Sequence, residues 1–451
     1  MKSNGSIRSP EGEGSARGGY GKLFRDDGYV HRDLYVQQSL FEDEMAYLFG
    51  STWVYIGHET EIPNPNDFVR RRIGRRPVIF VRKEDGALDV VVNRCPHRGA
   101  LLCRFDRGNA KRFTCGYHAW SFENSGACVA IPLRHAYGDD FRLEDHDLLK
   151  PARVDNYRGF VFASMSPDVP SLIEHLAGAA SYLDQWLDRG TGQKMIMNNG
   201  SMTFTCHANW KTVYDNAGDG YHPPFSHESM LRVFARRYGD DTDMSYFPSG
   251  TNEGPMISRD LGNGHTIIDQ RPAMHAQSAW KRQHVHPGRE ATEAAILERF
   301  GDEGGMKALD SSTGAGMNLS IFPNFMIVGN QVQLLDPISV NQTSIHWFST
   351  SLEGAPAEIN ATRMRMQEDF PSFGEVDDTA QWESCQEGME GVPEMEWIDI
   401  RRHMATGQGR VDVDGRETHP VTSDLHMRAY YRQWLRVMNG KACGASDAVG
   451  K

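Results

Sequence analysis

The spacing of apolar residues along the chain changes near residue 50. Between residues 31 and 49 they recur at helical spacing, at Leu34, Val36, Leu40, Phe41, Met45 and Leu48, which predicts a helix. From Trp53 onward the period switches to two, in short runs at 53–57, 76–82, 88–92 and 157–163 that are separated by Pro, Gly and Asp. This pattern is typical of strands joined by turns, so residues 46–166 are expected to form a small antiparallel β domain.

Other patterns fill the second part of the chain. Residues 171–187 predict a helix that begins after Ser171, a residue type favoured as an N-cap. Strands are expected at 199–205, 321–328, 331–336 and 344–352, and helices at 358–370 and 377–389. Residues 232–318 are expected to be an irregular excursion over a pocket, with one helical patch near 292–300. Together the patterns predict an α+β protein.

The length of 451 residues allows two domains. We expect residues 1–45 to form an N-terminal arm and a helix that packs on the larger domain, which spans residues 167–451 and holds an antiparallel sheet flanked by helices. Residues 1–28 are rich in Gly, Ser and charge, so a loose arm is expected there. The small polar tail after Gly440 is expected to be frayed.

Composition argues against several classes of protein. The formal net charge of −12 argues against a nucleic-acid partner, because phosphate binding needs clustered cationic surface. The seven Cys are an odd number in a long chain and are expected to be reduced. The start of the chain has no apolar core of a signal peptide, and no apolar run approaches the ~20 residues that a membrane span requires. These features predict a cytoplasmic protein without a membrane partner.

One dense basic run, residues 70–76, contains five arginines. The favoured interpretation is the solvated edge of a hairpin. The alternative is a docking patch for an acidic electron carrier.

Two short motifs each combine Cys with His. Cys95-Pro-His97 is followed, after seventeen residues, by Cys115-Gly-Tyr-His118. Each half offers one thiolate and one imidazole, which is the ligand set of a [2Fe–2S] cluster in which two His replace two Cys on one iron. Such a cluster accepts an electron at a higher potential than an all-Cys cluster. A structural zinc site is the alternative, although zinc modules usually open with two Cys two to four residues apart.

A second candidate site lies around His222 and His227. On an unbroken helix this spacing places the two side chains about 140° apart, too far for one ion. Pro223 and Pro224 must break or distort the helix after His222, which can bring the imidazoles together. Asp219 lies three residues before His222 on the same helical face, where it can hold an imidazole proton and fix the tautomer.

Two His and one carboxylate on one face of an iron form the facial triad of non-haem iron oxygenases, which leaves positions open for oxygen and substrate. Spacing alone does not select the carboxylate among the 60 Asp and Glu. The best run is Glu375-Val-Asp377-Asp378, although acidic residues at the start of a helix are also explained by the helix dipole.

Both motifs resemble those of the large (alpha) subunits of Rieske non-haem iron aromatic-ring-hydroxylating oxygenases, such as the benzoate/toluate, salicylate and terephthalate oxygenases. The likeness is carried by residues 95–101 and 115–120, by Asn209-Trp-Lys, by Asp219-Gly-Tyr-His222 with His227, and by residues 61–68. Gly116 departs from the pattern, since many relatives have Pro there, but no ligand is lost. The resemblance covers roughly residues 30–430.

The resemblance implies a role for each residue of the two motifs. Cys95, His97, Cys115 and His118 match the cluster ligands, and His222, His227 and Asp378 match the ligands of a mononuclear iron. Asp377 is the fallback for the third iron ligand. Asp219 matches a carboxylate that connects the iron ligand to the cluster of a neighbouring subunit, and Asn216 matches a nearby Asn.

The resemblance also implies an activity. The expected reaction is cis-dihydroxylation or monohydroxylation of an aromatic ring, most plausibly of an aromatic carboxylate, with O2 and electrons from NAD(P)H. Because no Gly-x-Gly-x-x-Gly fingerprint is present, a separate reductase, with or without a ferredoxin, must deliver the electrons. The implied assembly is a homotrimer or an α3β3 hexamer with small β subunits. Arg232, Arg236 and Arg237 are candidates for holding a substrate carboxylate, although surface charges on a helix are the favoured interpretation.

Three alternatives stay open at this point. The first is a Rieske monooxygenase or demethylase that acts on a neutral or nitrogen-bearing aromatic. The second is an electron carrier in which the second motif is structural. The third is a zinc-stabilised binding protein.

Overall fold

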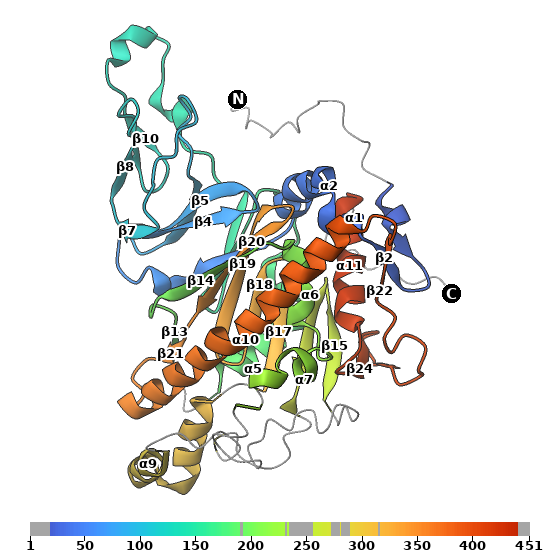
Figure 1. Ribbon diagram of the computed structural model, residues 1–451. Helices are drawn as coiled ribbons and strands as arrows, with labels where there is room; N and C mark the ends of the chain where they lie inside the picture. Colours follow the sequence, from blue (N-terminus) through green and yellow to red (C-terminus); the bar gives the residue numbers. More distant parts are fainter. Residues whose placement is uncertain are drawn as a thin grey trace.

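The computed structural model describes residues 19–189, 193–230, 232–233, 256–271, 280, 289–313 and 316–440. It confirms the expected α+β class, with a small antiparallel β lobe and a larger body built on one nine-stranded antiparallel sheet (Figure 1). In the part of the chain that is described, no helix is long and apolar enough to cross a membrane.

The small lobe holds two antiparallel sheets, at the upper left of Figure 1. One has the order β6–β5–β4–β7, with β4 at Asp67–Ile73, β5 at Arg76–Arg82, β6 at Leu88–Val92 and β7 at Arg107–Asn109. The other has the order β10–β9–β8, with β8 at Arg112–Thr114, β9 at Ser121–Glu123 and β10 at Cys128–Ala130. Phe68, Ile79, Phe113 and Phe122 belong to the core that the two sheets share.

A third sheet links this lobe to the larger body. It comprises β3 at Val54–His58, β11 at Arg153–Tyr157 and β12 at Phe160–Ser164. Tyr55 and Phe162 pack in one core with Phe325 of the nine-stranded sheet. Two helices follow, α4 at Leu172–Leu176 and α5 at Ala179–Leu187. Ser171 caps α4 as expected, in a capping box with Glu174.

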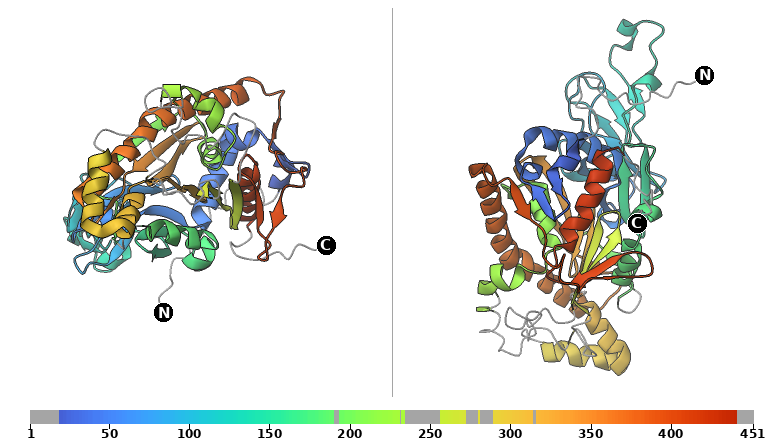
Figure 2. Two further views of the ribbon diagram at one scale, coloured as in Figure 1. Left: turned by 90° about the horizontal axis from the view of Figure 1, so that it is seen from below. Right: turned by 90° about the vertical axis from the view of Figure 1, so that its right-hand side faces the viewer.

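The nine-stranded sheet carries the rest of the fold. Its order is β14 (Ser201–Cys206), β20 (Gln342–Phe348), β19 (Gln331–Ser339), β18 (Phe325–Val328), β17 (Met317–Ile321), β16 (His265–Asp269), β15 (Ile257–Gly262), β24 (Glu417–Pro420) and β23 (Arg410–Val411). β13 (Met195–Ile196) pairs with β21 (Ser351–Leu352) beside it. One face packs on α4, α5 and the linking sheet, and the other is covered by α6 (Trp210–Ala217), α10 (Ala357–Gly391) and α11 (Leu425–Met438), as Figures 1 and 2 show.

The N-terminal region is more ordered than expected. The prediction of a loose arm through residue 28 was wrong for the last part of that segment, where η1 (Tyr20–Leu23) and β1 (Phe24–Arg25) are formed. β1 joins a sheet with β2 (Tyr29–His31) and β22 (Trp397–Asp399). Phe24 packs on Trp434, with ring centroids 5.8 Å apart. The predicted helix is a series of short helical segments: α1 (Asp33–Val36), α2 (Gln38–Asp43), η2 (Glu44–Leu48) and α3 (Phe49–Ser51). Residues 1–18 and the tail after Gly440 lie outside the described residues.

Two further expectations were wrong. The span 232–318 contains the β15–β16 hairpin and α9 (Arg289–Ser311), whereas residues 234–255 lie outside the described part. The hairpin turns at Asn263-Gly264, where both residues have positive φ (52° and 79°), a turn that an Asn-Gly pair favours. The two helices expected at 358–370 and 377–389 are one helix, α10, which continues through Pro371.

The basic run lies on the β4–β5 hairpin. Its arginines mostly pair within the chain: Arg70 with Asp106 at 2.6 Å, Arg71 with Glu61, and Arg75 with Glu42. These contacts favour the hairpin-edge interpretation over a docking patch.

Candidate metal centres

The two Cys–His loops of the small lobe share one backbone conformation. In residues 95–100 and again in 115–120, the Cys N–H donates to the carbonyl oxygen five residues later, at 2.8 Å. The N–H four residues after each Cys donates back to the Cys carbonyl, at 3.0 Å. That fourth residue, Gly99 or Ala119, has a positive φ of 76° or 56°. The two loops are therefore equivalent supports that face one another.

The loops separate thiols from imidazoles. Cys95 and Cys115 are buried next to each other, and His97 and His118 are partly exposed with ring centroids 4.5 Å apart. The Nδ1 atom of His97 is buried without a hydrogen-bond partner in the described structure. Two buried sulfur donors and two partly exposed nitrogen donors are a ligand set that would hold a [2Fe–2S] cluster. The four residues do not form a single-ion group in the described part of the chain, which argues against one zinc ion.

Aromatic side chains cover the imidazole of His97. The indole of Trp120 stacks on His97, with ring centroids 4.7 Å apart and an angle of 3° between the planes. Phe141 and His146, from the excursion around η4 (Arg134–Tyr137) and η5 (Leu143–His146), pack edge-on against Trp120. One face of the His97 ring is thereby shielded from water.

The second motif surrounds α7 (Pro223–Ser226): His222 directly precedes this helix and His227 directly follows it. α6 begins at Asn209, whose side chain accepts from the Lys211 N–H at 3.1 Å, and it ends at Ala217. The expectation that the helix breaks after His222 was therefore wrong, because it ends before Asp219. Close packing explains the early end: a Cβ on Gly218 would lie 2.0 Å from the His426 side chain, so the turn requires glycine there.

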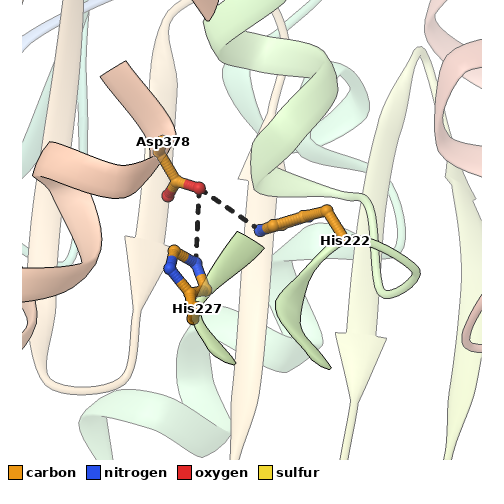
Figure 3. A group of neighbouring side chains, drawn as sticks. All are labelled: His222, His227 and Asp378. Carbon is orange, nitrogen blue, oxygen red and sulfur yellow. Dashed lines mark ion pairs between the residues drawn. The ribbon is translucent and has the colours of Figure 1, made fainter. Parts of the chain in front are cut away.

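His222, His227 and Asp378 converge in the larger body, as Figure 3 shows. The Nε2 atoms of His222 and His227 lie 3.5 Å and 3.3 Å from Oδ1 of Asp378. The three ligand atoms lie within 4.8 Å of one another. His227 and Asp378 are buried, and Asp378 comes from α10, about 150 residues further along the chain. The structure thus brings the three residues together as a group that can hold one ion.

Carboxylates also face the opposite nitrogens of both rings. Nδ1 of His222 lies 3.4 Å from Oδ2 of Asp219, and Nδ1 of His227 lies 3.4 Å from Oδ2 of Asp377. Carboxylates at these positions favour the tautomers that carry the proton on Nδ1, in which both Nε2 atoms can bind a metal. Asp377, the fallback ligand, therefore lies behind His227 and not beside the other ligand atoms. Asn216 lines the same cavity as Asp378 and lowers the pKa of that carboxyl, against the effect of burial.

The electrostatics of this group fit a divalent cation. Oδ1 of Asp378 is buried without a hydrogen-bond partner among the described residues. Burial raises the pKa of Asp378, and the two nearby imidazoles only partly oppose it. Burial lowers the pKa of His222, but Asp219 and Asp378 outweigh it and raise that pKa. A divalent cation would compensate the buried carboxylate, and two imidazoles with one carboxylate match non-haem iron(II).

A cavity of about 310 Å³ lies beside the triad. Its walls include apolar side chains such as Val213, Ile268 and Trp382, and amides of Gln270, Asn318, Gln331 and Gln333. Among the described lining residues there is no Lys or Arg. Arg232 is exposed and pairs with Glu228 at 2.6 Å, and Arg236 and Arg237 lie outside the described residues.

The cavity amides were not recognised from the sequence. Their signal was the alternation in β19, where Gln331 and Gln333 face the cavity while Val332 and Leu334 pack on the other face of the sheet. Such alternation shows which side of a strand is polar, but not that a ligand lies there.

The structure combines a β domain that carries paired Cys–His loops with an antiparallel sheet that is covered by helices and carries two His and one carboxylate. This combination defines the class of Rieske non-haem iron oxygenases. Residues 52–151 match the Rieske [2Fe-2S] domain, and residues 183–440 match the ring hydroxylating alpha subunit (catalytic domain). The chain belongs to the alpha subunits of the ring-hydroxylating oxygenases, as the resemblance implied, and is an oxidoreductase that uses a [2Fe–2S] cluster and a mononuclear iron.

Curated relatives and solved structures agree with this family. The large subunit of 2-halobenzoate 1,2-dioxygenase from Burkholderia cepacia is 33% identical over 82% of this chain and 79% of its own length. The alpha subunit of toluate 1,2-dioxygenase from Pseudomonas putida is 33% identical over 87% of this chain and 86% of its own. The structure of naphthalene 1,2-dioxygenase with bound indole aligns with a TM-score of 0.76 at 23% identity, over 93% of this chain and 94% of that one.

Proposed function

We propose that this protein is the terminal oxygenase that hydroxylates the ring of an aromatic carboxylate with O2 and with electrons from a separate NAD(P)H-dependent reductase. The observation that carries the proposal is the convergence of His222, His227 and Asp378 beside a cavity. The names of two relatives, which act on halobenzoate and toluate, support an aromatic acid as the substrate.

The protein residues have separate roles in this proposal. His222, His227 and Asp378 would hold iron(II), which supplies oxygen activation at its open positions when bound. Asp219 and Asp377 keep the Nδ1 protons of the two imidazoles, and Asn216 orients Asp378. The apolar cavity walls exclude water and hold the ring against the metal side.

A buried substrate carboxylate requires a cation or several hydrogen-bond donors. Because the described lining contains no cation, donors must come from amides. Gln270 directly follows β16 and Asn318 lies on the neighbouring strand β17. Both line the cavity, where their NH2 groups can donate to the two carboxylate oxygens. We assign the carboxylate to this end of the cavity.

Electron delivery requires a second copy of the chain. The lobe that carries the cluster loops, with β8 and β10, lies at the upper left of Figure 1, away from α7 in the lower part of the larger body. Asp219 lines the inner cavity and also a hollow of about 630 Å³ on the outside of α10. The cluster of one copy is proposed to dock in this hollow of its neighbour, so that Asp219 and His222 complete the path to the metal. Repetition of this contact forms a ring of three, with or without small β subunits.

Charge complementarity supports this docking. Arg94, Arg98 and Arg104 are exposed around the cluster loops, and no carboxylate pairs with them within the described structure. The hollow includes Asp219 and Asp424, and burial raises the pKa of Asp424 to about 6. Complementary charges of this kind set orientation and association rate more than affinity.

The test of the function is oxygenation of aromatic acids by the protein loaded with iron and supplied with a matched reductase. Product masses distinguish dihydroxylation from monohydroxylation and demethylation. The variant His222→Ala should lose bound mononuclear iron and all product, while the visible spectrum of the [2Fe–2S] cluster is retained. Retained turnover in His222→Ala would support an electron carrier and refute the oxygenase site.

The assembly has its own test. Mixing His222→Ala protein with Cys95→Ser protein gives hybrids in which one copy has only the cluster and its neighbour only the mononuclear iron. Activity in these hybrids is expected because the two centres act across the contact. No activity, with mixing shown by mass, would refute transfer between copies. The division into residues 1–45, 46–166 and 167–451 belongs to the same proposal, and limited proteolysis tests its boundaries.

A further inference from the structure

The cavity beside the triad is polar at two opposite ends. Asn318 on β17 is paired with Val328 on β18, and Val328 is paired with Gln331 on β19. Neighbouring strands lie about 4.8 Å apart, so the Asn318 end and the Gln331 end are separated by about 10 Å. Val328 makes the middle of this row apolar. An aromatic ring that binds its carboxylate at Asn318 therefore presents a substituent toward the Gln331 end.

Glu375 closes that second end. It lies on α10, three residues before Asp378, and its side chain is only 1% exposed. Trp347 lines the same cavity as Glu375, and it is paired with Gln333 across β19 and β20. These positions place the Glu375 carboxyl over the part of the sheet that carries Gln331 and Gln333.

Two polar atoms at this end lack partners. Oε1 of Glu375 and Nε2 of Gln331 are buried and make no hydrogen bond in the described part of the structure. Both residues line the cavity, and Gln331 is 3% exposed. A buried polar atom without a partner is costly, so an arrangement of two such atoms around one cavity points to a ligand group that completes them.

The chemistry of Glu375 limits what that group can be. Burial raises the pKa of Glu375 to about 8, and the nearby Asp378 carboxylate adds to the effect. No described lining residue supplies a positive charge. Whether or not the carboxyl is protonated, it keeps an acceptor oxygen. An N–H or O–H on the ligand satisfies that oxygen, and the heteroatom that carries the hydrogen can accept from Gln331. A methyl group or a halogen leaves both atoms unpaired.

We propose that Glu375 and Gln331 form a binding site for a hydrogen-bond-donating ring substituent, so that amino- and hydroxy-substituted aromatic acids are the preferred substrates. This inference rests on the proposed function, and it names the substituent that the cavity selects. Glu375 is thereby a specificity-determining residue that contacts the substrate and is separate from the metal-binding group.

The expected preference follows from one hydrogen bond to a buried carboxyl group. Its loss is expected to lower kcat/KM by about 10- to 150-fold. The wild-type protein should therefore favour an aminobenzoate over the methylbenzoate with the same ring position by at least about tenfold. Amino and methyl groups have similar sizes, so this comparison isolates the hydrogen bond.

The experiment compares wild type with Glu375→Leu and Glu375→Gln, with all proteins loaded with cluster and iron. Dissociation constants for the isomeric aminobenzoates and methylbenzoates are measured by calorimetry without oxygen, and kcat/KM is measured with reductase. Glu375→Leu should lose the preference, mainly through KM, and Glu375→Gln should retain part of it because its amide oxygen still accepts. Glu368→Gln is the matched control, since Glu368 is exposed on the same helix.

Several results would overturn the inference. Equal dissociation constants for amino and methyl acids in the wild type would do so regardless of activity. An equal loss of product from both acids in Glu375→Leu, with iron still bound, would place Glu375 in the metal site. A binding preference without any product from aromatic acids would instead refute the proposed function and leave the inference about Glu375 intact.

Discussion

Removal of the Glu44 carboxylate is expected to destabilise the helix that leads to the proposed iron site. Glu44 is fully buried and accepts four hydrogen bonds. Lys211 donates to its two oxygens at 2.8 and 2.9 Å, and the indoles of Trp210 and Trp434 donate at 3.0 and 2.7 Å. This one carboxylate therefore ties η2 to the start of α6 and to α11.

The expected magnitude follows from these contacts. Glu44→Leu leaves the Lys211 ammonium buried without a counter-ion, and loss of one partner of a buried pair costs about 3–5 kcal/mol. Burial already lowers the pKa of Lys211, so loss of its proton in the variant limits the penalty to this range. In Glu44→Leu/Lys211→Met both charges are absent, so the loss of stability is expected to be smaller than in Glu44→Leu. The remaining cost comes from the indole N–H groups of Trp210 and Trp434, which lose their acceptor in both variants.

The assay is urea unfolding at pH 7 followed by tryptophan fluorescence, with the visible circular dichroism of the cluster recorded separately because two domains need not unfold together. Glu42→Leu is the control, since Glu42 forms a largely exposed pair with Arg75 and should change stability by less than about 1 kcal/mol. The reasoning is refuted if Glu44→Leu costs less than about 1 kcal/mol, or if the double variant is no more stable than Glu44→Leu.

Three further predictions concern the region around α6. Burial raises the pKa of Asp215 to about 7, so the folded state holds this proton more tightly than the unfolded chain, whose ordinary value is 3.8. Stability should therefore fall as the pH rises from about 4 to 7 and level off above, and Asp215→Asn should flatten the dependence of the urea midpoint on pH. Gly218→Ala should lower bound iron at least tenfold, as measured by metal analysis, because its Cβ would overlap His426. Asp219→Asn should retain both metal centres but slow reoxidation of the reduced cluster by substrate and O2 at least tenfold, as followed by rapid-mixing absorbance.

Each of these predictions has a contrary result. A pH dependence in Asp215→Asn identical to that of the wild type would assign it to other groups. Full iron content in Gly218→Ala would show that the turn can move away from His426. Reoxidation at the wild-type rate in Asp219→Asn would exclude Asp219 from the electron path, and loss of iron in that variant would show that it acts only by fixing His222.

Local features of the fold followed from the sequence because they depend on neighbouring residues. The capping of α4 by Ser171 and the strands of the small lobe depend on short-range spacing. The Asn263-Gly264 pair is an equally local indication of a turn. The sequence nevertheless did not predict the β15–β16 hairpin, because the residues around this pair mix Arg, Gly, Asp and His without a strand-like alternation. The sequence predicted a break in α10 near Pro371, whereas the helix is continuous. Here the packing of α10 against distant parts of the chain outweighs the local tendency of proline to break a helix.

For the candidate site, the sequence determined the type and order of the donors. The Cys–His spacing predicts the two equivalent loops, and the spacing of Asp219, His222 and His227 predicts that they share one site. The third carboxylate was decided only by tertiary structure. Asp377 and Asp378 are adjacent, but successive side chains on a helix point about 100° apart. The rotation of α10 against α6 and α7 therefore directs Asp377 to Nδ1 of His227 and Asp378 to the Nε2 atoms of both His222 and His227. The polar ends of the cavity likewise exist only where strands distant in sequence pair, because the register of β17, β18 and β19 sets which amides face Glu375.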